Sequence, residues 1–121
     1  MVTRFLLCIT CAALAACGVK PQTVNELIIQ NRTSEVVYEV KLKIPETGKV
    51  VSCSSILSGS ECSLGFPERA LQGNLANLSW QEDGVGYSRT LSAGNIAAVS
   101  DRPLHAVVVI LPGGHLQAGL E

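Results

Sequence analysis

Residues 36–44 read Val-Val-Tyr-Glu-Val-Lys-Leu-Lys-Ile, an alternation of apolar and mostly polar side chains. Because successive side chains of a β-strand point to opposite faces, this period of two predicts a strand with one face buried and the other in water. Pro45 ends the run, since proline has no N–H to donate to a neighbouring strand. The buried face is expected to consist of Val36, Tyr38, Val40, Leu42 and Ile44.

Shorter strand signals flank this run. Upstream, residues 26–30 (Glu-Leu-Ile-Ile-Gln) precede the turn-forming residues 31–34 (Asn-Arg-Thr-Ser), so the first two strands are expected to form a hairpin. Downstream, residues 49–53 and 61–65 enclose a serine-rich loop. These two segments are expected to pair with each other.

The second half of the chain repeats the pattern. Residues 77–81 and 87–91 flank Asp83-Gly84, a dipeptide that is common in tight hairpin turns. Residues 104–111 (Leu-His-Ala-Val-Val-Val-Ile-Leu) are almost continuously apolar, as expected of a strand covered on both faces. A Pro-Gly-Gly turn then leads to a last short strand, residues 115–120.

Seven or eight short strands without an amphipathic helix predict an all-β fold, a small antiparallel β-sandwich over residues 25–121, with a barrel as the alternative. Trp80 is expected in its core. A chain of 121 residues has room for one domain. Nine Lys and Arg against ten Asp and Glu give a net charge of −1. This balance provides no field to hold a polyanion, so no nucleic-acid partner is expected.

The first seventeen residues have the features of an export signal. Arg4 precedes a twelve-residue apolar stretch, residues 5–16, that ends in small residues. The boundary Leu14-Ala15-Ala16-Cys17 resembles the lipobox of bacterial lipoproteins, with Leu three residues before the Cys and small residues between them. The resemblance covers residues 1–17 and says nothing about the domain that follows.

This resemblance implies that a peptidase removes residues 1–16 by cutting between Ala16 and Cys17. The Cys17 sulfur then carries a diacylglyceryl group, and residues 17–24 form a short tether between the lipid bilayer and the sandwich. The expected location is the bacterial cell envelope. In enterobacterial lipoproteins an Asp after the lipidated Cys favours the inner membrane, whereas this chain has Gly18. For a Gram-negative source, Gly18 therefore favours the periplasmic face of the outer membrane.

Cys53 and Cys62 are the only free thiols that remain after export and lipidation. In an oxidising compartment such a pair is expected to form a disulfide, here one that closes a ten-residue loop. The alternative is a metal site. Two thiolates do not complete the four-coordinate shell of zinc, and neither His105 nor His115 has a short ligand spacing to them, so no metal is expected.

Residues suited to catalysis are few. The chain has no Gly-x-Ser-x-Gly motif, and His105 on its apolar strand is more typical of a partly buried, hydrogen-bonded residue than of a base. His115 follows two glycines and is expected in solvent. The expected function is a non-enzymatic, membrane-anchored binding or scaffolding module. Its expected partners are the bilayer, through Cys17, and another envelope protein, and it has no cofactor besides the covalent lipid.

Two alternatives come from other functional classes. A small envelope enzyme built around His105 requires a pocket that holds this residue and an acid. An inhibitor of an extracytoplasmic hydrolase requires the serine-rich loop to protrude. One interpretation of Lys41, Lys43 and Lys49 is a basic stripe that contacts lipid phosphates. Glutamates near the first two of these lysines favour an ordinary solvated surface instead.

The substitution Cys17→Ser is expected to abolish membrane attachment, because lipid on this sulfur is the anchor that the lipobox implies. Labelling of cells with a clickable palmitate analogue, followed by membrane fractionation, measures this. Incorporation of the label into the Cys17→Ser protein would contradict the assignment of the boundary.

Overall fold

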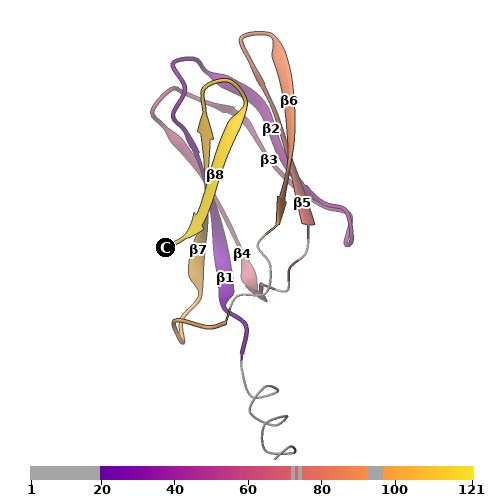
Figure 1. The fold of residues 1–121 in the computed structure, drawn as a ribbon, viewed down its shortest axis with the longest axis vertical. Helices are drawn as coiled ribbons and strands as arrows, with labels where there is room; N and C mark the ends of the chain where they lie inside the picture. Colours follow the sequence, from indigo (N-terminus) through magenta and orange to yellow (C-terminus); the bar gives the residue numbers. More distant parts are fainter. Residues whose placement is uncertain (1–19, 72, 74, 93–96) are drawn as a thin grey trace, which may run out of the picture.

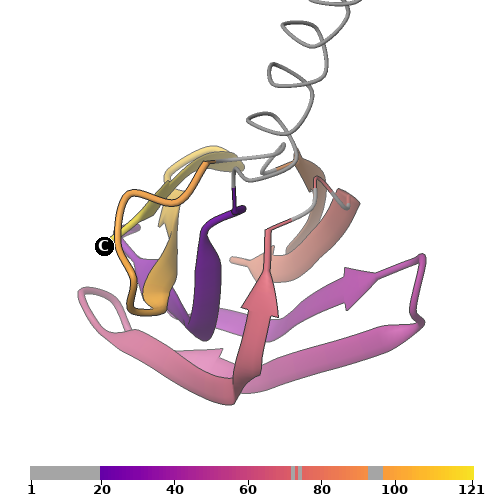
Figure 2. The same cartoon turned by 90° about the horizontal axis from the view of Figure 1, so that it is seen from below.

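Two four-stranded β-sheets face each other in the computed structural model, which describes residues 20–71, 73, 75–92 and 97–121 (Figures 1 and 2). The first sheet has the order β4-β1-β7-β8 and the second β3-β2-β5-β6. The strands are β1 (Thr23–Asn31), β2 (Val37–Ile44), β3 (Lys49–Ile56), β4 (Glu61–Ala70), β5 (Leu75–Glu82), β6 (Val85–Ser92), β7 (Leu104–Leu111) and β8 (His115–Leu120).

The predicted all-β sandwich of seven or eight strands is confirmed, and the barrel alternative is wrong because the eight strands form two separate sheets. Neighbouring strands run antiparallel, with one exception. β1 and β7 lie side by side in parallel, with Leu27 opposite Ala106 and Ile29 opposite Val108. Parallel strands cannot be connected by a tight turn, and these two are accordingly far apart in the chain, as its first and seventh strands.

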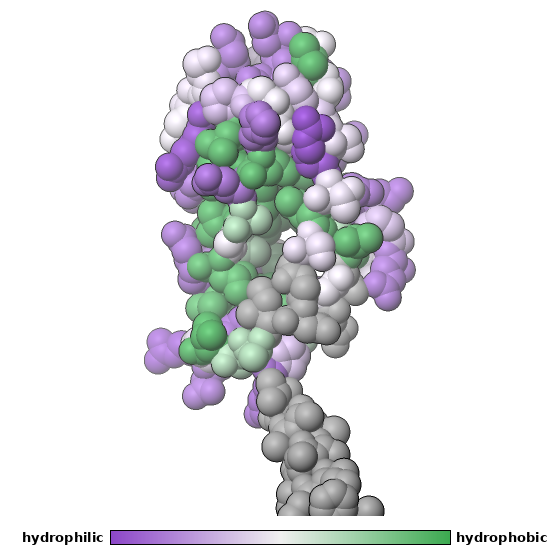
Figure 3. Space-filling view, in the orientation of Figure 1, coloured by the Kyte–Doolittle hydropathy of each residue, from purple (hydrophilic) through white to green (hydrophobic). Residues whose placement is uncertain are grey.

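The tightly packed core occupies one half of the sandwich, which we call the closed half. It contains the ends of β1, β3, β5 and β7 and lies uppermost in Figure 1. Its fully buried side chains come from both sheets and include Trp80, so the predicted core position of this residue is confirmed. In the opposite half, which we call the cleft half, apolar surface is visible in a hollow between the sheets (Figure 3).

The chain crosses between the sheets after β1, so the predicted hairpin of the first two strands is wrong. Residues 31–34 do form a turn, but it is organised by the buried Asn31 side chain. The Asn31 Oδ1 accepts from Thr33 N and Oγ1 at 2.9 and 2.7 Å, and its Nδ2 donates to the carbonyls of Glu35 and Ile56, both at 2.8 Å. Since Ile56 lies on β3, this side chain ties β1 to the second sheet.

A second crossing follows β3, so the predicted pairing of residues 49–53 with 61–65 is also wrong. β3 pairs with β2, whereas β4 pairs with β1 in the other sheet. Of the four serines expected in the loop, Ser54 and Ser55 lie on β3, and the other two lie in the connection, which is the short segment 57–60. The fault lay in treating sequence neighbours as spatial neighbours.

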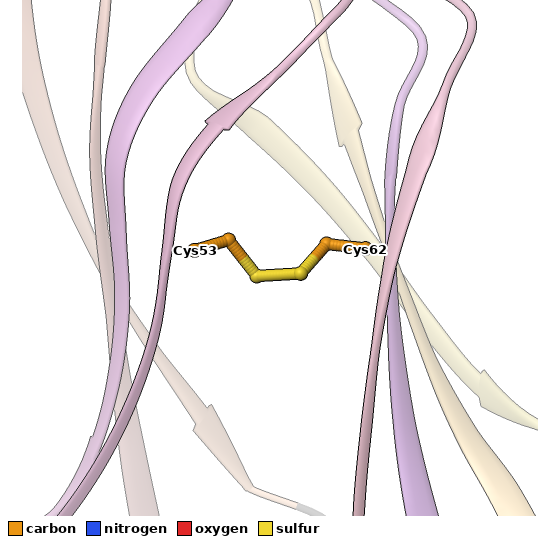
Figure 4. Close-up of a disulfide and its surroundings, with 2 residues drawn as sticks. All are labelled: Cys53 and Cys62. Atoms are coloured by element: carbon orange, nitrogen blue, oxygen red, sulfur yellow. A yellow bond between two sulfur atoms is a disulfide. The ribbon is translucent and has the colours of Figure 1, made fainter.

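Cys53 and Cys62 lie at disulfide distance, as predicted, with an S–S separation of 1.95 Å and a Cα–Cα separation of 6.7 Å (Figure 4). The two residues belong to different sheets rather than to paired strands. The bridge therefore joins edge strand β3 of the second sheet to edge strand β4 of the first.

Three hairpins connect strands within the sheets. The predicted β5–β6 hairpin is present, and both Asp83 and Gly84 have the positive φ angles, 51° and 77°, of a type I′ turn. The two strands predicted at residues 104–111 and 115–120 are present as β7 and β8, and they pair with each other. A third hairpin, between β2 and β3, was not predicted.

A β-bulge in β2 changes which residues face inward. Glu39 has a φ of 50°, and the register against β5 shifts between Tyr38 and Lys41. Val37 and Val40 are consequently both fully buried, whereas Tyr38 is 51% exposed. The expected inward position of Tyr38 is wrong, because one extra residue in the strand reverses the faces on its two sides.

The folded domain begins earlier than expected. β1 starts at Thr23, and the preceding Gln22 is fully buried. The Gln22 Nε2 donates to the carbonyl of Arg102 at 3.1 Å, and its Oε1 accepts from Val99 N and Ser100 N at 2.9 and 3.2 Å. Residues 22–24, expected in the tether, thus belong to the sandwich. The signal peptide, Ala16 and Cys17 lie outside the described residues.

The double substitution Cys53→Ala/Cys62→Ala is expected to lower the free energy of unfolding by about 2.5–3 kcal/mol, the chain-entropy value for a ten-residue loop. Differential scanning calorimetry would then show a drop in melting temperature of about 10 °C or more. Lipidation depends on residues 1–17 and should persist. Two free thiols in the mature protein under nonreducing mass analysis would refute the bridge.

Candidate functional site

Two sets of contacts, which we call the fastenings, join the sheets in the closed half. One lies at each pair of facing edge strands. On the β3/β4 side the fastening is the Cys53–Cys62 bridge together with the Asn31 side chain. On the β6/β8 side, Arg89 Nε donates to the carbonyl of Gly114 at 2.8 Å, which joins β6 to the turn before β8. None of these contacts lies in the cleft half.

The fastening at Gly114 is tightly packed. Gly114 is buried and has a φ of 79°, and the Tyr87 ring stacks on Trp80 with a centroid separation of 5.5 Å. The Arg89 guanidinium lies over the same ring, 5.6 Å from its centroid. A Cβ added to Gly114 would stand 2.6 Å from Tyr87 Cε1 and 2.7 Å from Arg89 Nη2. Only glycine fits this position, so the approach of β6 to β8 depends on it.

Beyond the fastenings, in the cleft half, a cleft with a volume of 570 Å³ opens between the sheets. It is lined by the starts of β1, β3, β5 and β7 and by the ends of β2, β4, β6 and β8. The apolar lining residues of the first sheet include Leu27, Phe66, Ala106, Val108, Ala118 and Leu120, and those of the second include Leu42, Ile44, Val51, Leu75 and Leu91.

Many of these residues point inward but are not buried. Leu42, Phe66 and Leu91 pack against the core and are only partly buried, and Ala118 and Leu75 are exposed. In the closed half, by contrast, Ile29 and Leu78 are 1% and 0% exposed. The interior of the sandwich is therefore open to solvent at this end, and it is apolar.

Among the residues that the structure describes, two charged side chains line the cleft, and both are cations. Lys49 opens β3, and Arg69 lies near the end of β4. Within the part of the chain that the structure describes, neither side chain forms an ion pair. Lys49 pairs with the inward-facing Ile44, whereas Lys41 and Lys43 are exposed on the outer face of β2. The three lysines therefore do not form one stripe.

His105 lies outside the cleft. Its Nε2 is 3.2 Å from Glu26 Oε1, as expected from the parallel register that places these residues opposite each other. The His105 side chain is 46% exposed, on the outer face of the first sheet, rather than partly buried. The histidine does meet an acid, but neither residue lines the cleft. His115 is exposed, as predicted.

The turn between β3 and β4 does not protrude. Gly59 N donates to the carbonyl of Asn31 at 2.8 Å, Asn31 N donates to the carbonyl of Ser60 at 2.9 Å, and the Ser58 hydroxyl donates to the carbonyl of Thr33. Leu57, directly after β3, is the exposed large apolar residue of this connection, with 62% of its surface accessible. An inhibitory loop would need a longer, free-standing hairpin.

Residues 20–71, 73, 75–92 and 97–121 contain no cluster of three or more His, Cys, Asp or Glu side chains that could hold a metal ion. Over the same residues, no helix has the length and apolar character needed to span a membrane.

No protein-family model matches this chain, and no curated protein does. Among solved structures, the chain is similar to the NMR structure of a protein from Eubacterium rectale, with 12% sequence identity and a TM-score of 0.48. The alignment covers 82% of this chain and 88% of that one.

The cleft was not predicted from the sequence. Its lining residues look like ordinary core positions, since the inward-facing pattern of Leu42 and Ile44 continues that of Val40. One usable signal is the presence of small residues in the last two strands. Ala106, Ala118 and Gly119 lie on neighbouring strands β7 and β8 and leave volume where a core would carry large side chains.

Gly114→Ala is expected to lower the free energy of unfolding by about 2–5 kcal/mol, because the added methyl combines a left-handed backbone with a collision against Tyr87. Gly113→Ala is the matched control. It has a similar φ of 77°, but its nearest neighbour would be His115 Cδ2 at an ordinary 3.5 Å, so its cost is about 1–2 kcal/mol. Urea unfolding measures both values. Equal losses would show that the packing against Tyr87 contributes nothing.

Proposed function

We propose that this protein is a bacterial envelope lipoprotein, anchored through lipid on Cys17, whose β-sandwich binds an apolar molecule in the cleft between its sheets. The cleft is the observation that carries this proposal. Its volume of 570 Å³ falls within the roughly 300–1,000 Å³ of small-molecule sites, and its walls are mainly apolar, as the walls of such sites are.

The energetics favour a ligand of this kind. Each methylene group that moves from water into the cleft contributes about 0.8 kcal/mol, and it also covers inward-facing side chains such as Leu42 and Leu91. A ligand that binds only the folded chain stabilises it by mass action. An open apolar interior thus lowers the stability of the unliganded domain, and a bound hydrophobic molecule raises it.

The position of the anchor supports the same function. Three residue steps separate Cys17 from Lys20, the first described residue, and even a fully extended chain spans only about 10 Å over that length. The chain enters the sandwich at the start of β1, which belongs to the cleft half (Figure 1). Lipid on Cys17 would hold the cleft half close to the bilayer, on the periplasmic face of the outer membrane if the source is Gram-negative.

The alternative functions have less support. An enzyme built around His105 would act on the outer face of the first sheet, away from the cleft. An inhibitor would use the turn between β3 and β4, which is short and hydrogen-bonded against Asn31 and Thr33. The cleft also favours binding over a purely scaffolding role.

Ala118→Trp is expected to block the cleft, because Ala118 lines it from β8 and is exposed enough to accept a large side chain. The matched control is Gln117→Trp, which adds the same indole to the outward-facing neighbour. The full-length lipoprotein in nanodiscs is irradiated with photoactivatable hexadecanol, and mass spectrometry quantifies labelled peptides from the cleft strands. We expect a loss of labelling of about tenfold in Ala118→Trp and none in the control.

Equal labelling of wild type and Ala118→Trp, with both variants melting at the same temperature, would contradict binding in the cleft. A loss of labelling in Ala118→Trp supports the proposal only if this variant melts at the same temperature as the wild type, because an unfolded variant would also lose its label.

A further inference from the structure

We propose that the ligand of the cleft is a long-chain fatty acid, a single acyl chain whose carboxylate is held by Lys49 and Arg69. This inference rests on the proposed function, since it names the chemistry of the molecule that the cleft binds. It adds a head-group preference that an apolar cavity alone would not have.

The charge of the lining carries this inference. The chain has more acids than bases, ten against nine, yet the described residues of the cleft lining include Lys49 and Arg69 and no Asp or Glu. Neither cation is neutralised by an ion pair within the described residues. Their side chains also donate none of the hydrogen bonds that the structure records over the same residues, so their donors are available. Such a site attracts an anion and repels a cation.

The topology places the two cations on the same side of the cleft. β3 and β4 are the edge strands that the Cys53–Cys62 bridge joins. Lys49 is at the start of β3 and Arg69 is near the end of β4, so both lie on the cleft side of the bridge. Both residues are exposed, which puts their charges at the rim. An arginine guanidinium can bind a carboxylate with two parallel hydrogen bonds, and a lysine adds a point charge.

The walls suit the remainder of such a molecule. Leu27, Leu42 and Phe66 also line the cleft, and along their strands they lie closer to the closed half than Lys49 and Arg69 do. The cleft therefore presents an apolar interior and a cationic rim, which is the arrangement that an anionic amphiphile with one tail would match. The diacylglyceryl group on Cys17 lacks an anionic head, so this charge pattern does not favour the protein's own lipid as the occupant.

The test compares two probes of equal chain length on the full-length lipoprotein in zwitterionic nanodiscs. Photoactivatable palmitate is expected to label the cleft strands about tenfold more than photoactivatable hexadecanol, which has no charge. Lys49→Gln/Arg69→Gln should lower the ratio of palmitate labelling to hexadecanol labelling from about ten to about one. The control Lys41→Gln/Lys43→Gln removes the same charge from the outer face of β2 and should leave this ratio unchanged.

The outcomes separate this inference from the proposed function. Equal labelling by palmitate and hexadecanol would overturn the head-group preference while leaving the cleft as a binding site. Labelling that requires Cys17→Ser would mean that the protein's own acyl chain fills the cleft, and stronger labelling by photoactivatable phosphatidylglycerol would assign it to a two-chain lipid. Each of these two results overturns the fatty-acid proposal. Failure of every probe to label the cleft would overturn the proposed function as well.

Discussion

The buried amide of Asn31 is the interaction on which the arrangement of the two sheets depends. It sits where β1 ends, and its two polar atoms make four hydrogen bonds, to Thr33, to the carbonyl of Glu35 and to the carbonyl of Ile56. These contacts redirect the chain from the first sheet to the second and fix the end of β3 beside the end of β1. An unpaired amide buried at this point would cost about 1–3 kcal/mol for each unsatisfied group, so arrangements that bury Asn31 without these partners are disfavoured.

The asymmetry of the sandwich follows from where such contacts lie. Asn31, the Cys53–Cys62 bridge and the Arg89–Gly114 hydrogen bond all join the sheets in the closed half, and large side chains such as Trp80 fill the space between them. In the cleft half the inward positions of β7 and β8 carry Ala106 and Ala118. Small side chains and the absence of a fastening in the described part of this half together account for an apolar cleft, without requiring any strained segment.

Local features of this fold were predictable from the sequence, whereas long-range ones were not. The Asp83-Gly84 turn specifies its hairpin because both residues tolerate positive φ, and the alternation in residues 40–44 specifies a strand with Leu42 and Ile44 inward. The sheet to which each strand belongs depends on contacts between residues far apart in the chain, such as Asn31 with Ile56, and no period or turn dipeptide encodes these. The bulge at Glu39 was not predicted, because neither composition nor hydropathy marks a bulge residue. The bulge nevertheless exchanges the faces of the strand that Val37 and Tyr38 occupy. The candidate site combines residues from all eight strands, so only its elements were within reach of sequence analysis.

The chain enters the domain at its cleft half, so a lipid on Cys17 would bring the cleft near the bilayer. A lipid on Cys17 would hold Lys20 within about 10 Å, and Gln22 fixes the chain firmly to the domain immediately afterwards through Arg102, Val99 and Ser100. Such a tether allows little separation between the cleft half and the head-group region of the bilayer. A hydrophobic ligand that moved between membrane and cleft would then avoid most of the free-energy cost of exposing its chain to water, which is about 0.8 kcal/mol for each methylene. The same cleft at the opposite end of the sandwich, beside the β3–β4 turn, would lack this advantage. A lipid anchor on Cys17 would therefore make exchange with the bilayer the physically favoured route for filling the cleft.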